Sequence, residues 1–244
     1  MRTIKLVIGF VGTRYEGWQS QRKGKTIQEV FEKILEKILT QKTHLAGASR
    51  TDSGVHALGF AAHFKARSFL PDKKIKDALN FYLPRDIVVY SAKTVPGEFH
   101  ARFNAKSKIY RYDIWNSPTR PLLEDPYVLW YPRLLDIFLM KKAAVHFIGK
   151  RDFAAFEART EERRSTVRHL KRLSVKKKKS LIRIEAEGDG FLRHMIRIVV
   201  GTLIEVGRKK MAPQDIPNIL KSKNRRRAGP TAKAHGLTLV KVKY

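Results

Sequence analysis

The sequence predicts an α+β fold, because strand-like and helix-like segments alternate along the chain and the alternation occurs twice. In some segments apolar residues alternate as in a strand, and in others they recur at positions i, i+3, i+4 and i+7. A proline-rich stretch over residues 116–134 separates the two series. The 244 residues, 43% of them hydrophobic, suffice for one large or two small domains with a packed core. We therefore expect two similar α+β halves, over residues 1–104 and 105–244.

The first half predicts the order strand, helix, strand, helix, strand. The first helix starts after Thr26, because Thr26 and Glu29 have the spacing of an N-terminal capping box and the apolar period continues to Leu39. The polar, glycine-containing segment before it reads as a loop. The expected elements are a strand at 3–11, a loop at 12–25, a helix from residue 26, a strand at 55–64, a helix at 71–83 and a strand at 86–95.

The second half repeats this mixture after an arm that leads into a strand within residues 99–116. A lysine-rich turn at 176–179 separates two strands over 170–188. Pro213 suits the first turn of a helix. The other expected elements are helices at 135–148, 191–207 and 212–223 and a strand at 236–244.

Positive charge dominates the composition, since 51 Lys and Arg against 22 Asp and Glu give a net charge of +29. Such an excess indicates a polyanionic partner. The sequence has no long apolar span and no polybasic amphipathic helix, so we expect nucleic acid and no membrane. The early apolar run "LVIGFVG" is too short for a signal sequence, and the cytoplasm is the expected location.

Metal chemistry has little support in the sequence. The chain contains no cysteine and no His-Glu-x-x-His pair, so the common zinc ligand patterns are missing. We expect no metal ion.

Asp52 is the main candidate for catalysis, within the glycine-containing stretch "GASRTDSGVHALG" at residues 47–59. Asp beside Ser53 and Gly54 is also typical of a turn. Arg50 lies two residues earlier, where an extended backbone places both side chains on one face. A nearby guanidinium favours the ionised carboxylate, which suits a nucleophile better than a general acid. The residues alone leave both roles open.

The stretch "GASRTDSGVHA" resembles the Gly-Ala-Gly-Arg-Thr-Asp-Ala-Gly-Val-His-Ala signature of the TruA family of tRNA pseudouridine synthases. Ser49 and Ser53 replace a glycine and an alanine of the signature, and both substitutes are small. Further blocks match the family in order over nearly the whole chain: "GTRYEGWQSQ", "TIQEVFEKIL", "ALNFYLPRDIVV", "FHARFNAKSKIYRYDIWN", "DFAAF", "GFLRHMIRIVVGTLIEVG" and "AGPTAKAHGLTLVKVKY".

The resemblance implies an enzyme that isomerises uridine to pseudouridine at positions 38, 39 and 40 of the tRNA anticodon stem-loop, without a cofactor. It also implies two ferredoxin-like halves that share a merged, mainly antiparallel sheet, with helices on one side and a basic active-site cleft. The family works as a homodimer, which the sequence alone does not demonstrate. A uridine in a stem must be flipped out before it reacts.

The resemblance also assigns site residues. Asp52 is the implied nucleophile, attacking either C1′ or uracil C6, and Arg50 orients it and helps to occupy the space of the displaced base. Tyr110 stacks on the target base and is a candidate to remove the C5 proton, while Arg197 is a second active-site basic residue. Substrate-binding roles are further expected for Tyr110, Leu237, His56, His100, Arg102 and Trp18.

Several of these assignments have structural alternatives. Tyr110 and Leu237 also fit core positions of strands. Trp18 and Tyr15 either stack on RNA or pin their loop to the core, and His56 and His100 either bind phosphate or organise the cleft. For the whole protein, the charge alone would equally suit a noncatalytic RNA-binding protein or RNA chaperone. A nuclease would need a second acid or base near Asp52, and no Asp or Glu is close in sequence.

Overall fold

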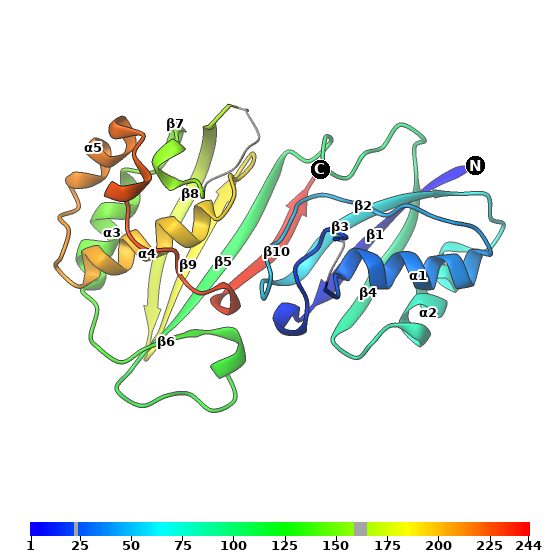
Figure 1. The fold of residues 1–244 in the computed structure, drawn as a ribbon, viewed down its shortest axis with the longest axis horizontal. Coiled ribbons are helices and arrows are strands. Elements are labelled where there is room, and N and C mark those ends of the chain that lie inside the picture. Colours follow the sequence, from blue (N-terminus) through cyan, green and yellow to red (C-terminus); the bar gives the residue numbers. More distant parts are fainter. Residues whose placement is uncertain (22–23, 159–164) are drawn as a thin grey trace. The chain divides into compact units, whose positions relative to one another are not determined.

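The structure, a computed structural model, describes residues 1–21, 24–158 and 165–244. The chain divides into two compact units (Figure 1). Unit 1 consists of residues 1–106 and 238–244, and unit 2 of residues 107–237. The first boundary lies two residues from the expected one, whereas the final strand, expected in the second half, joins unit 1.

Unit 1 carries the Asp52 segment. Its elements in chain order are β1 (Arg2–Phe10), the 3-10 turn η1 (Gly12–Arg14), α1 (Ile27–Leu39), β2 (Ala46–Gly47), β3 (His56–Ala66), α2 (Asp72–Tyr82), β4 (Ile87–Val95) and β10 (Leu237–Lys243), whose first residue belongs to unit 2.

The strands of unit 1 follow the order β4-β1-β3-β10. β1 is antiparallel to both β3 and β4, and β2 adds antiparallel to β3. β10 runs parallel to β3, with Thr238 opposite His56. This pairing explains why residues 238–244 belong with unit 1: they extend its sheet next to the strand that follows Asp52.

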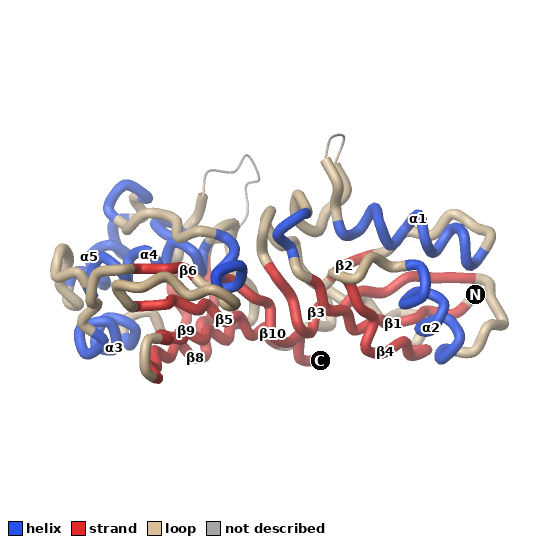
Figure 2. The backbone as a smooth tube through the Cα atoms, turned by 90° about the horizontal axis from the view of Figure 1, so that it is seen from below, coloured by secondary structure: helices blue, strands red, loops and turns tan. Residues whose placement is uncertain are grey.

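Helix α1 forms where the capping pattern predicts it. The Thr26 side chain accepts a hydrogen bond from the Glu29 backbone N–H at 3.3 Å, which satisfies one of the free donors of the first turn. The helix buries Ile27, Phe31 and Leu35 completely and lies along one face of the unit 1 strands (Figure 2). The apolar period therefore marks the face that covers the sheet.

Unit 2 carries Tyr110 and Arg197. Its remaining elements are β5 (Ser107–Asn116), η2 (Asp125–Tyr127), β6 (Leu129–Tyr131), α3 (Ile137–Val145), β7 (Gly149–Asp152), η3 (Ala154–Phe156), β8 (Val167–Lys178), β9 (Leu181–Gly188), α4 (Met195–Gly207), α5 (Asp215–Ser222), η4 (Arg225–Arg227) and η5 (Ala234–Gly236).

The strands of unit 2 follow the order β5-β9-β8-β7, and these pairs are antiparallel. The short β6, which the sequence did not predict, pairs parallel to β5. α4 is buried along most of its length and packs against α3. The mixed α+β architecture with mainly antiparallel strands is thus confirmed, and the ferredoxin-like halves, the merged sheet and the basic cleft stay predictions.

Two helix starts differ from the sequence prediction by three residues or more. α4 begins at Met195 rather than Phe191, because His194 has a left-handed φ of 59° that a helix does not continue through. α5 begins at Asp215, so Pro213 precedes the helix. The Pro213 carbonyl accepts from the Ile216 N–H at 3.3 Å, which makes residues 213–216 a lead-in turn.

Candidate active site

Asp52 lies in a tight turn between β2 and β3. Its carbonyl accepts a hydrogen bond from the Val55 N–H at 3.2 Å, which closes a four-residue turn. Gly54 has a φ of +77° in this turn, a value that glycine adopts at little cost. Asp52 is half-buried and Arg50 is exposed. The turn therefore leaves Asp52 partly accessible to solvent.

Residues 12–18 hold the Asp52 turn from both sides. Before Asp52, the Thr51 carbonyl accepts from the Trp18 N–H at 3.1 Å. After it, the Tyr15 carbonyl accepts from the Gly54 N–H at 3.3 Å and from the Ser53 hydroxyl at 3.2 Å. These bonds fix the main chain around Asp52.

Gly17 permits this close approach. A Cβ at Gly17 would lie 2.4 Å from the Thr51 carbonyl oxygen, and its φ is +90°. Both the contact and the backbone conformation exclude a larger residue without local rearrangement. Gly17, between Tyr15 and Trp18, thus allows the loop at residues 12–18 to pack closely against the Asp52 turn.

Trp18 and His56 lie near the turn and make internal contacts. Trp18 is only 3% exposed, and its ring stacks on Phe60 with centroids 4.0 Å apart. His56 is 4% exposed, and its Nδ1 accepts from the Gly12 N–H at 3.1 Å. For both residues the geometry favours the organising role that the sequence left open over direct contact with RNA.

His100 and Arg102 are not brought to the Asp52 turn. The His100 ring lies against His63, with centroids 4.7 Å apart, and His63 is seven residues beyond His56 on β3. At a rise of roughly 3.3 Å per residue this places His100 about 23 Å along the strand from the turn. Within unit 1, His100 and Arg102 therefore do not cluster with Asp52.

The loop that carries His100 and Arg102 is held by local hydrogen bonds. The His100 Nδ1 accepts from the Arg102 N–H at 3.1 Å, and burial, followed by the charge of Arg102, lowers the pKa of His100. Arg102 is exposed. The sequence analysis missed Phe103, which is 75% exposed with its ring 4.3 Å from that of His100. Its signal was an aromatic residue directly after Arg102, an expected substrate-binding residue.

Tyr110 occupies a buried position on β5 of unit 2. It lies opposite Ala186 of β9 and is 6% exposed. Phe191 meets its ring edge-on, with centroids 5.2 Å apart and an interplanar angle of 88°. This contact fixes the plane of the tyrosine ring, as a stacking residue requires.

Arg197 and the segment that leads into Leu237 are connected. In the first turn of α4 the Arg197 Nε donates to the Ala232 carbonyl at 2.8 Å, and the Ala232 N–H donates to the Arg197 carbonyl at 3.0 Å. Leu237 follows five residues later and is 6% exposed. The structure thus brings the Arg197 side chain to the segment that precedes Leu237.

Tyr112 is a supporting residue that the sequence analysis missed. Its hydroxyl donates to the Lys233 carbonyl at 2.7 Å, and burial raises its pKa well above the usual range although the charge of Arg197 acts in the opposite direction. Tyr112 shares the β5 face with Tyr110, two residues away. That spacing in "KIYRY" was the available signal.

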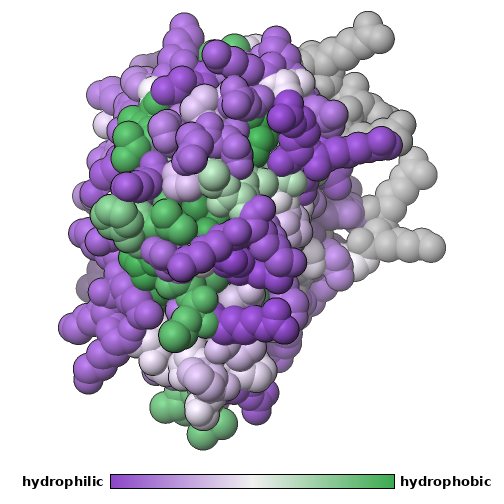
Figure 3. Space-filling model, turned by 90° about the vertical axis from the view of Figure 1, so that its left-hand side faces the viewer, coloured by the Kyte–Doolittle hydropathy of each residue, from purple (hydrophilic) through white to green (hydrophobic). Residues whose placement is uncertain are grey.

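No metal site is found within residues 1–21, 24–158 and 165–244: no three His, Asp or Glu side chains are grouped closely enough to hold an ion. In this same part of the chain, none of the helices has the length and apolarity to cross a membrane. The face drawn in Figure 3 is largely hydrophilic, with apolar residues gathered in smaller areas.

A family model described as tRNA pseudouridine synthase matches residues 6–104 and 143–244. This chain belongs to the tRNA pseudouridine synthase family. The matched residues of this synthase family include Asp52, Arg50, Arg197 and Leu237, whereas Tyr110 lies between the two matched ranges.

Full-length relatives extend the family match over the whole chain. Proteins named tRNA pseudouridine synthase A from Acetivibrio thermocellus, Ruminiclostridium cellulolyticum and Thermoanaerobacter sp. (strain X514) are 43%, 45% and 44% identical to this family member, with 100% of each chain covered. A chain of a crystal structure titled "Cbf5-Nop10-Gar1 Complex" is 13% identical at a TM-score of 0.30 over 82% of this chain, which is too low to indicate a shared fold.

Proposed function

We propose that this protein isomerises uridine to pseudouridine at positions 38, 39 and 40 of the tRNA anticodon stem-loop, with Asp52 as the nucleophile. The observation that supports it best is the Asp52 turn. A carboxylate is held half-buried at the surface by backbone hydrogen bonds on both sides, in a protein with a net charge of +29. A protein that only binds RNA gains nothing from a fixed carboxylate, because this anion repels phosphate.

The reaction breaks the bond between C1′ and uracil N1 and forms one between C1′ and C5. The C5 proton leaves and N1 ends with a proton, so the product is an isomer of uridine. Asp52 attacks either C1′ or uracil C6, and a carboxylate adduct splits the exchange of bonds into two steps. The neighbouring Arg50 orients the carboxylate and helps to fill the space of the displaced base.

In the same proposal Tyr110 stacks on the target uracil and takes the C5 proton. Arg197 supplies a second positive charge to the reacting nucleotide, and Leu237 lines the uracil pocket. The edge-on contact of Phe191 with Tyr110 supports a fixed ring, and the bond from Arg197 to Ala232 supports a fixed guanidinium.

Binding to tRNA must offset the cost of extruding the uridine, which is on the order of a few kcal/mol. We propose that contacts of Lys and Arg side chains with tRNA phosphates supply this binding energy, and that Arg102 contributes from a position distant from Asp52. The proposal further includes a homodimer, a merged sheet with a basic cleft, and action in the cytoplasm, and it requires no cofactor.

The test measures tritium release from tRNA labelled at uracil C5. Asp52→Asn and Asp52→Ala should lower the rate by about 10³-fold or more, as expected for removal of a covalent nucleophile, with tRNA affinity within a few-fold of the parent. Asp77→Asn is the matched control, because Asp77 is an exposed aspartate of unit 1 on α2. Label release that survives in Asp52→Ala would contradict the mechanism.

A noncatalytic RNA-binding protein is the second candidate, favoured by the charge alone. This candidate predicts that the parent protein binds tRNA but releases no tritium from it. Cleaved tRNA on a denaturing gel would instead indicate a nuclease.

A further inference from the structure

Asp86 ties the segment after β1 to the start of β4. Its carbonyl accepts from the Val11 N–H at 2.9 Å, and its carboxylate Oδ1 accepts from the Tyr15 hydroxyl at 2.7 Å. Arg14 pairs with Oδ2 at 2.9 Å. The Asp86 side chain is 11% exposed, whereas that of Arg14 is 77% exposed. An ion pair with so exposed a partner contributes little, so the bond from Tyr15 is the main side-chain link.

Tyr15 carries this link to the Asp52 turn. Its ring is 3% exposed, and burial together with the hydrogen bond to Asp86 raises the pKa of its hydroxyl well above the usual range, so the hydroxyl stays a donor. The Tyr15 carbonyl accepts from Ser53 and Gly54, the two residues that follow Asp52. Tyr15 therefore connects Asp86, which its hydroxyl binds, to the Asp52 turn, which its carbonyl binds.

We propose that Asp86 and Tyr15 are positioning residues for Asp52: the Asp86 carboxylate anchors the Tyr15 ring, and the Tyr15 carbonyl sets the place of the Asp52 turn. This inference rests on the proposed function only in naming Asp52 as the nucleophile. Displacement of a reacting group by about 1 Å can cost about 10²-fold in rate. A half-buried surface turn of this kind would move readily without an anchor outside its own loop.

Three variants of this Asp86–Tyr15 link separate its parts. Tyr15→Phe keeps the buried ring and removes only the donor. Asp86→Ala removes the acceptor and the charge. Asp86→Asn keeps an oxygen that can accept from the Tyr15 hydroxyl, so it is the conservative rescue.

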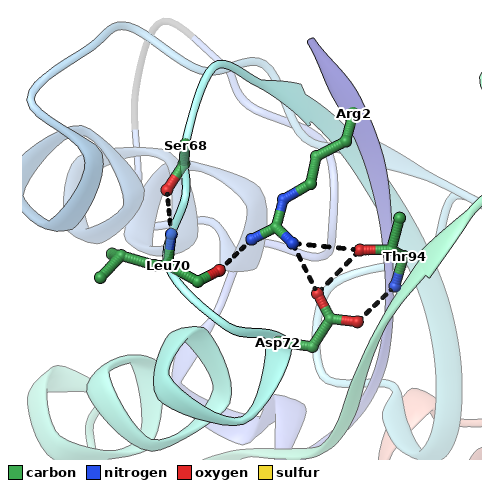
Figure 4. A network of polar contacts seen from close by, with 5 residues as sticks. All are labelled: Arg2, Ser68, Leu70, Asp72 and Thr94. Atoms are coloured by element: carbon green, nitrogen blue, oxygen red, sulfur yellow. Dashed lines mark hydrogen bonds and ion pairs between the residues drawn. The ribbon is translucent and has the colours of Figure 1, made fainter.

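A matched control exists at the other end of β1. Asp72 also joins separate segments: its carboxylate accepts from the Thr94 N–H at 2.7 Å and the Thr94 hydroxyl at 2.8 Å, and it pairs with Arg2, which also donates to the Leu70 carbonyl (Figure 4). Arg2 and Val11 are nine residues apart on the path of β1, which corresponds to about 30 Å. Asp72→Ala thus removes a comparable network far from the Asp52 turn.

Single-turnover tritium release at saturating enzyme is the first measurement. We expect the rate to fall by about ten- to 10²-fold in both Tyr15→Phe and Asp86→Ala, as for a misplaced nucleophile, and to stay within about threefold in Asp86→Asn. tRNA affinity should stay within about twofold in all three, because the Tyr15 and Asp86 side chains are largely shielded from the surface. Asp72→Ala should lower the melting temperature and leave the rate unchanged. Rates that fall equally in Asp72→Ala and Asp86→Ala, in step with melting temperature, would overturn the inference.

Amide hydrogen exchange is the second measurement, and it needs no activity. The Gly54 amide donates to the Tyr15 carbonyl, so its exchange should speed up in Tyr15→Phe and stay at the parental rate in Asp72→Ala. Unchanged exchange at Gly54 in Tyr15→Phe would refute the link even if the parent enzyme is active. A parent protein without label release would refute the proposed function, while the exchange data would still decide the inference.

Discussion

At the scale of single residues, Tyr110 and Tyr112 have different tasks although they share one face of β5. The Tyr110 ring is met edge-on by Phe191, and no step of the proposed chemistry uses Tyr112. The Tyr112 hydroxyl instead holds the Lys233 carbonyl, just beyond the residue that Arg197 binds. We therefore expect substitutions of the two hydroxyls to separate chemistry from stability.

Tyr112→Phe should lower the free energy of unfolding by about 0.5–1.5 kcal/mol, because it removes the part-buried hydrogen bond from the Tyr112 hydroxyl to the Lys233 carbonyl. Urea denaturation measures this loss. Tyr110→Phe should instead slow single-turnover label release, by about 10-fold or more if its hydroxyl takes the C5 proton. A Tyr110→Phe enzyme with the parental rate would remove Tyr110 as the base and leave only its stacking role.

Arg102 provides a second residue-scale prediction. Since it is exposed and its neighbour His100 lies about 23 Å along β3 from His56, Arg102→Ala should weaken tRNA binding and leave the single-turnover rate at saturating enzyme unchanged. The slope of log affinity against log salt concentration should decrease in magnitude by about 1, the value expected for the loss of one phosphate contact. A lower saturating rate with unchanged affinity would instead place Arg102 in the chemistry. Lys93→Ala, an exposed cation of β4, is the control.

At the scale of elements, capping and periodicity patterns predicted those helices and strands whose positions depend on residues close in sequence. The capping pair Thr26 and Glu29 located the start of α1, and alternation located β3, β4 and the β8–β9 hairpin. The start of α4 was misjudged because apolar spacing continues through 191–194, while the backbone at His194 does not. β6 is three residues long and exists through its pairing with β5, a partner that periodicity cannot reveal.

The candidate site was predicted in part for the same reason. The motif placed Asp52 close to Arg50, and for Trp18 and His56 the sequence left RNA contact and an organising role both open. Whether an aromatic residue faces solvent or packs on Phe60 depends on contacts distant in sequence, and so does the link from Asp86 to Tyr15 across 71 residues.

β10 permits a prediction about a whole element. Deleting residues 238–244 should destabilise unit 1, since it removes the strand next to β3, the bond from the Tyr244 hydroxyl to the Ala101 carbonyl at 2.8 Å and the contact of Lys5 with the Tyr244 ring. Amide exchange at His56 and Ala57 should rise toward that of an edge strand. Lys241→Ala, an exposed residue of β10, is the control. Protected amides after the deletion would show that unit 1 holds together without this strand.

At the scale of the whole molecule, the net charge of +29 sets how the protein meets its substrate. We expect the KM for tRNA to rise at least about tenfold between about 50 and 200 mM KCl, because each phosphate contact releases counterions. The saturating single-turnover rate should hardly change over that range. Filter binding and label release measured in parallel check this, and a salt-independent KM would exclude phosphate contacts as the main source of affinity.

The parallel pairing of β10 with β3 has a consequence for synthesis on the ribosome. Residues 1–106 emerge early, yet the strand that lies beside His56, four residues after Asp52, is translated only after the 131 residues of unit 2. A nascent chain therefore carries Asp52, the proposed nucleophile, long before the neighbouring strand is made.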